Sequence, residues 1–99
     1  MDAFAIGASG VRSAAVRLAS SAHNVANLTT SSFRPLRTVQ TSLEQGGASA
    51  TVVREPTPQP VDLLHEIVEQ MQAGLQFDAS LRVLATASET RGSLVDLLA

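Results

Sequence analysis

The side chains that most often carry out chemistry in proteins are sparse in this sequence. It contains two histidines, His23 and His65, and no cysteine. A zinc site needs three or four His, Cys or carboxylate ligands at close spacing, and neither histidine has a second one nearby. We therefore expect His23 and His65 to be surface or interface residues, and we expect no metal ion or other cofactor.

Two arrangements of reactive residues can be drawn, and neither is complete. Serine, histidine and aspartate are all present, but no Gly-x-Ser-x-Gly turn accompanies them to expose a nucleophile. The run Gly7-Ala8-Ser9-Gly10 resembles part of a phosphate-binding loop, but it lacks the Lys-Ser/Thr ending and a preceding strand. The sequence therefore predicts that the protein is not an enzyme.

Composition and charge narrow the classes of partner. The net charge is −2 and every basic residue is arginine, so no basic face is expected to bind nucleic acid. No apolar run is long enough for a membrane span, so we expect no membrane insertion. The N-terminus carries Asp2 and no basic cluster, which predicts that no signal peptide is cleaved.

Residues 1–28 carry an apolar repeat that predicts a long helix. The repeat alternates spacings of four and three and consists of Phe4, Ala8, Val11, Ala15, Leu18, Ala22 and Val25. This heptad is typical of a coiled-coil seam, and its alanine edge allows a partner helix to approach closely. The alanine edge has two interpretations, packing on the second helix or contact with another copy, and we expect both on different faces. Arg12 and Arg17 fall outside the seam.

The first helix is expected to end near Asn27. Thr29-Thr30-Ser31-Ser32 competes for backbone hydrogen bonds, and Pro35 disfavours helix at the residue before it. Asn24 and Asn27 have two interpretations: their amides cap backbone groups at the helix end, or they bridge to a neighbouring subunit.

Residues 29–60 are predicted to form an extended connector. Gly46-Gly47 marks a turn, and Ala50 through Arg54 has the β-branched content of a short strand. Pro56, Pro58 and Pro60 then favour an extended, semi-rigid stretch.

Residues 61–99 are predicted to form a second helix, with Asp62 and Glu66 favourably placed in its first turns. Its apolar residues are Leu64, Val68, Met71 and Leu75, followed by Phe77, Leu81, Leu84, Val95 and Leu98. These residues form an apolar stripe along the helix, but their helical spacing is interrupted near Gly74, so the stripe shifts around the helix there. The helix is therefore expected to bend there, or to contact different partners on the two sides of that point.

Together these elements predict one all-α domain over residues 1–99, a coiled-coil-like hairpin of two long helices joined by the connector. Aromatic residues make up only 3% of the chain, with no Trp or Tyr, so few large side chains are available to form a hydrophobic core within one chain. Two such helices paired only with each other leave apolar surface in water. The sequence therefore predicts an oligomer.

Three stretches in order resemble the bacterial flagellar axial family of rod and hook proteins. The first is Ser9-Gly10-Val11 followed by a helix of small residues. The second, Ala22 through Arg34, is similar to the family's Asn-Asn-Ile-Ala-Asn signature leading into Thr-Thr-Gly-Phe-Lys. The third comprises Val61-Asp62-Leu63, Glu66, Met71, Phe77-Asp78-Ala79, Arg82-Val83-Leu84, Thr86-Ala87 and Glu89.

The resemblance implies that the two ends pair as helices inside the axial tube, where many copies pack helically. It also implies localisation in the rod of the basal body, which spans the periplasm, and export through the flagellar type III apparatus without signal cleavage. His23 replaces the usual Asn, Ser32 replaces the turn Gly before Phe33, and Gly74-Leu75 stands where Gln-Arg is frequent. The large middle domain is absent, which favours a short proximal-rod-like member over a hook or filament protein.

We therefore expect a structural rod subunit that self-assembles with like or related axial proteins. The expected assembly residues are the seven heptad positions of the first helix, with Asn24, Asn27, Leu64, Val68, Met71, Phe77, Leu81 and Leu84. The alternative is a small helical adaptor or chaperone that uses the same amphipathic faces to hold another flagellar or export protein. An adaptor should form a closed complex, whereas an axial subunit should form open helical contacts. A divergent paralogue that never enters the rod, and an enzyme of unrecognised type, are the remaining alternatives.

Overall fold

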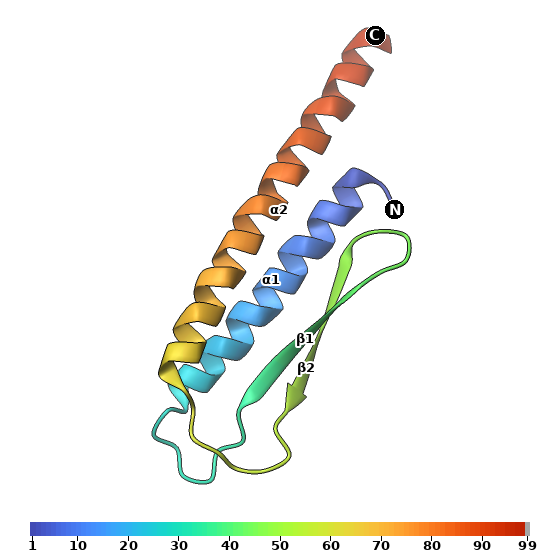
Figure 1. The fold of residues 1–99 in the computed structure, drawn as a ribbon. Coiled ribbons are helices and arrows are strands. Elements are labelled where there is room, and N and C mark those ends of the chain that lie inside the picture. Colours follow the sequence, from blue (N-terminus) through green and yellow to red (C-terminus); the bar gives the residue numbers. More distant parts are fainter. Residues whose placement is uncertain (99) are drawn as a thin grey trace.

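The computed structural model describes residues 1–98, and Figure 1 shows their arrangement. The chain forms helix α1 (Ala3–Ala26), strand β1 (Leu36–Ser42), strand β2 (Ala48–Arg54) and helix α2 (Leu63–Leu98). The two helices lie side by side, and the hairpin of β1 and β2 packs along α1. Helix α1 is therefore the central element and contacts all the others.

The expected all-α fold is wrong, because residues 29–60 contain a two-stranded antiparallel sheet. The predicted strand at Ala50 through Arg54 lies within β2, but its partner β1 was not predicted. Strand β1 carries Thr38, Val39 and Thr41, whose β-branched side chains favour strands. Few of its residues are apolar, so the alternation between its faces gives a weak hydrophobic signal. The fold is mostly helical but mixed.

The hairpin turn depends on its two glycines. Gly46 and Gly47 have φ values of 94° and 87°, a left-handed conformation that residues with a Cβ rarely adopt. The Gly46 N–H donates to the Leu43 carbonyl, and the Leu43 N–H donates to the Gly47 carbonyl. The strands then pair in register from Ser42 opposite Ala48 to Leu36 opposite Arg54.

Capping side chains define the helix ends. The Asp2 carboxylate accepts a hydrogen bond from the Ala5 N–H at the start of α1, and Asp62 accepts one from the His65 N–H at the start of α2. The amide of Asn27 donates to the His23 carbonyl at the end of α1. The Asn27 side chain therefore caps the end of α1 within the chain.

The interior between the elements consists almost entirely of small and polar side chains. Within residues 1–98, the buried apolar residues are Ala14 and Ala73, and the buried polar residues are Ser9, Ser13, Ser20, Ser21, Asn24 and Glu66. Because the stabilisation from burial scales with apolar area removed from water, two alanines contribute little. Hydrogen bonds and close backbone approach therefore help to hold the elements together, beside half-buried apolar residues such as Ile6 and Leu84.

The molecule is long and thin, with extents of 62 × 23 × 15 Å. Its radius of gyration is 17.2 Å, against about 13 Å for a compact chain of this size. It exposes 6575 Å², whereas a compact monomer of 10.3 kDa exposes about 5,400 Å². Neither helix within residues 1–98 combines the length and the apolar character needed to cross a membrane.

Candidate assembly surface

The buried seam between α1 and α2 has the predicted heptad period but lies one residue earlier than the predicted positions. On α1 it includes Gly7, Ala14 and Ser21, which are all buried. The predicted alanine edge is more open: Ala8 is half-buried, and Ala15 and Ala22 are exposed. Consecutive residues on a helix are about 100° apart. The predicted stripe is therefore rotated away from α2, and it lies on the side of α1 opposite the hairpin.

Glycines bring the two helix backbones close together near the start of α1. A Cβ built on Gly7 would lie 3.0 Å from Leu84 Cγ and 3.2 Å from the Ser80 carbonyl oxygen. A Cβ on Gly10 would lie 2.2 Å from Ser80 Oγ. These glycines therefore allow close approach and do more than weaken the first turns of the helix.

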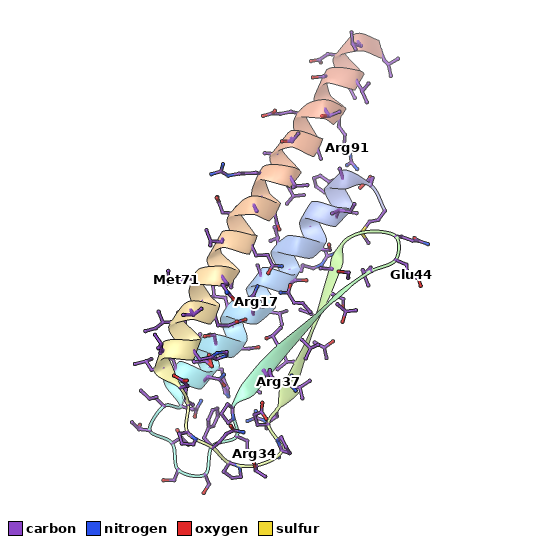
Figure 2. All side chains as sticks on the ribbon, in the orientation of Figure 1. Arg17, Arg34, Arg37, Glu44, Met71 and Arg91 are labelled. Atoms are coloured by element: carbon purple, nitrogen blue, oxygen red, sulfur yellow. The ribbon has the colours of Figure 1, made fainter. Side chains whose placement is uncertain are left out.

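Arg17, which the sequence placed outside the seam, lies in it and binds three side chains of α2. Its guanidinium donates to Glu69 at 2.8 Å, to Gln76 at 2.8 Å and to Gln72 at 3.2 Å. Figure 2 shows its side chain between the two helices. The hydrogen bond from Arg17, together with its charge, lowers the pKa of Glu69 below the ordinary value of 4.5 despite partial burial. This contact fixes the register of α1 against α2.

Asn24 joins all three layers of the fold. Its Nδ2 donates to Glu66 Oε1 on α2 at 3.0 Å and to the Leu36 carbonyl at the start of β1 at 2.8 Å. Its Oδ1 accepts from the Leu36 N–H at 2.7 Å, and the side chain is 1% exposed. Ser21 Oγ donates to the Glu66 carbonyl beside it. Asn24 therefore belongs to the internal framework and not to the exposed assembly surface.

The turn after α1 departs from ordinary backbone geometry at Ser32. Its φ of 54° lies in the left-handed region that favours glycine. Phe33 follows, with its ring centroid 5.7 Å from that of His23.

A second cluster fastens the start of α1 to α2. The Asp2 carboxylate accepts from the Arg91 guanidinium, which also lies 4.7 Å from the centre of the Phe4 ring. The Ala5 N–H and then Arg91 lower the pKa of Asp2 below its ordinary value. Beyond Arg91, helix α2 continues past the start of α1 (Figure 1), and its apolar residues Leu94, Leu97 and Leu98 are exposed.

The change of phase in α2 divides its apolar residues between two sides of the helix. Leu64, Val68, Met71 and Leu75 form an outer stripe on the side away from α1, and Figure 2 shows Met71 at that edge. Leu64, Met71 and Leu75 are 65–72% exposed. After the change of phase, Leu84 lies beside Gly7 of α1, whereas Phe77 and Leu81 are 40% and 42% exposed. The helix is continuous through Gly74.

The predicted heptad stripe of α1 forms a second apolar face. Phe4 and Leu18 are exposed, and Val11 and Val25 are half-buried. Ala15 and Ala22 leave shallow positions between these larger side chains. The chain therefore presents two different apolar faces to solvent, one with long side chains and one lined with alanine.

Within residues 1–98, no group of three or more His, Asp or Glu side chains is arranged to hold a metal ion. The sequence matches no protein-family model and no curated protein.

Proposed function

We propose that this protein is a non-catalytic structural subunit of the bacterial flagellar basal-body rod. In this proposal it assembles with copies of itself and with other axial proteins through its terminal helices. The observation that carries the proposal is the inverted distribution of side chains. Small and polar residues fill the interior, while Phe4, Leu18, Leu64, Met71 and Leu75 are exposed. Such a chain gains most of its apolar burial from partners.

Two further features support the flagellar assignment. The terminal segments that carry the family-like motifs lie against each other as helices, as the resemblance implies for axial subunits. The second motif also ends in a turn whose backbone at Ser32 has the conformation suited to the family's glycine. The proposed location is the rod that spans the periplasm, reached through the flagellar type III apparatus without signal cleavage.

The test is localisation in purified basal bodies. Both termini belong to helices in the proposed assembly, so an epitope tag is best inserted between Glu44 and Gln45, which are exposed at the hairpin turn (Figure 2). We expect the tagged, full-length and uncleaved protein in isolated basal bodies. A variant with Met71→Asp and Leu75→Asp should be exported but missing from them, because two charges disrupt the outer stripe.

The matched control is Thr41→Asp with Thr51→Asp, two exposed positions on the hairpin. It adds the same charges away from both apolar faces and should be incorporated normally. Absence of the wild-type protein from basal bodies, with a soluble complex of fixed stoichiometry in its place, would favour the adaptor alternative and contradict the rod proposal.

A further inference from the structure

The two apolar faces differ in shape in a way that suits them to each other. The outer stripe of α2 (Leu64, Val68, Met71 and Leu75) consists of long side chains that project into solvent. The outer face of α1 carries Ala15, Ala19 and Ala22, which are exposed and short. Long side chains of one helix fit the shallow positions that alanines leave on another. Within one copy the two faces point in different directions and cannot meet.

Charges at the edges of the two faces set a register. Arg12 borders the alanine face, is exposed, and forms no ion pair within residues 1–98. Asp78 lies one turn after Leu75, at the end of the outer stripe. Within the described part of the chain Asp78 forms one ion pair, with Arg82, and the two side chains are 62% and 80% exposed. Such an exposed pair contributes little, so Asp78 is available to another cation.

We propose that the outer stripe of α2 in one copy binds the alanine face of α1 in a second copy, antiparallel and without axial displacement. This inference rests on the proposed function and specifies its contact. Inside one chain Gly10 lies against Ser80, and Asn24 against Glu66. The same register between copies places Leu75 level with Ala15 and Val68 level with Ala22. It also places Asp78 level with Arg12.

The alternative of one outer stripe binding another is less favourable. In a parallel pair the two Asp78 carboxylates would face each other, and like charges in such positions repel. In an antiparallel pair that matches Leu64 with Leu75, Asp78 would be level with Val61, where there is no cation. Of these three contacts, the one between the stripe and the alanine face places a cation level with Asp78.

The size of the exposed surface also fits a second copy. The chain exposes roughly 1,200 Å² more than the scaling relation for compact monomers gives. A standard protein interface buries about 800 Å² on each partner. Because the two proposed faces are different, every pair of copies leaves one face of each kind free. Further copies can therefore add side by side in the same orientation.

Single cysteines test this contact directly, because the chain has none of its own. Ala15→Cys and Leu75→Cys are made in separate full-length proteins that carry tags of different size at the hairpin turn, then mixed at high concentration and oxidised. We expect the mixed disulfide to dominate over both symmetric products. Thr51→Cys, exposed on the hairpin, replaces Ala15→Cys as the matched control and should give no mixed product.

A charge exchange provides the second measurement. Arg12→Asp in the Ala15→Cys protein should abolish the mixed disulfide, and Asp78→Arg in the Leu75→Cys protein should restore it. Circular dichroism checks that each variant remains folded. A dominant disulfide between two Leu75→Cys copies, or no mixed product, would overturn the inference. Basal-body localisation would be unaffected by that result, so this failure is distinguishable from failure of the proposed function.

Discussion

At the scale of single residues, the internal contacts depend on a few polar side chains whose roles differ from their appearance in the sequence. Arg17 reads as a solvated charge, yet it is 14% exposed and binds α2 through three acceptors. Asn24 reads as a helix-end residue, yet it connects α1, α2 and β1. Sequence patterns locate such residues poorly, because a polar side chain is compatible with both solvent and a satisfied interior position.

Replacing Arg17 should destabilise the fold in a pH-dependent way. Arg17→Ala is expected to lower the free energy of unfolding by about 1–2 kcal/mol near pH 7. The folded pKa of Glu69 is lowered, so its contribution is present above its ordinary pKa of 4.5 and is lost as the pH falls through the lowered value. Urea denaturation should show a smaller difference from wild type at pH 3 than at pH 7. Arg12→Ala is the control and should change stability little at either pH.

Ser32 offers a stabilising substitution. Because its φ of 54° is unfavourable for a residue with a Cβ, Ser32→Gly should raise the free energy of unfolding by about 0.5–1 kcal/mol. Ser31→Gly, one residue earlier in the same turn, has no positive φ to relieve and should be neutral or destabilising. Thermal unfolding of both variants measures the effect. Equal shifts in the two variants would show that the strain at Ser32 is not relieved by glycine.

At the scale of the elements, the sequence predicted both long helices and the heptad period but not the phase of the buried seam. The prediction placed the large apolar residues at the seam, which is the usual arrangement when a helix packs on a core. Here Gly7, Ala14 and Ser21 are buried instead, since small residues allow the backbones to approach closely. Strand β1 was missed because its inner face is mainly polar, and only the turn glycines and β2 carried a clear signal.

Adjacent alanines on α1 test the phase. Ala14 is 1% exposed, so Ala14→Leu should destabilise the fold by about 1–3 kcal/mol through overpacking. Ala15 is exposed, so Ala15→Leu should leave unfolding nearly unchanged and should weaken assembly instead. Chemical denaturation and incorporation into basal bodies measure the two effects. If Ala15→Leu destabilised the fold as much as Ala14→Leu, the buried seam would lie at the positions predicted from the sequence.

Glycines provide an independent test of the close helix contact. Gly7→Ala places a Cβ against backbone atoms of α2 and should lower the midpoint of denaturation. Gly74→Ala meets no atom within 4 Å and should stabilise α2 by about 1 kcal/mol, because alanine is the better helix former. Both changes remove one glycine from a helix. If their effects on stability are opposite, the difference is due to the close contact at Gly7. A stabilising effect of Gly7→Ala would contradict the backbone approach described at this position.

At the scale of the whole molecule, the fold is a thin antiparallel unit whose two ends depend on each other. Residues after Gln76 supply Ser80, Leu84 and Arg91, which contact the first half of α1. Deleting residues 77–99 should therefore cause the start of α1 to fray, since a helix of its length is marginally stable alone. Helicity by circular dichroism should fall by more than the deleted residues account for, and the truncated chain should be absent from basal bodies. Normal helicity per residue with normal incorporation would remove the basis for paired ends.

The unequal lengths of the helices have a mechanical consequence. Over most of its length the molecule consists of α2, α1 and the hairpin packed together. After Arg91 it continues as a single helix (Figure 1). Resistance to bending rises steeply with the thickness of a beam, so under an applied load most of the bending would occur in the segment from Gly92 to Leu98. Its exposed leucines mark it as the part whose stiffness depends most on being clamped by a neighbour.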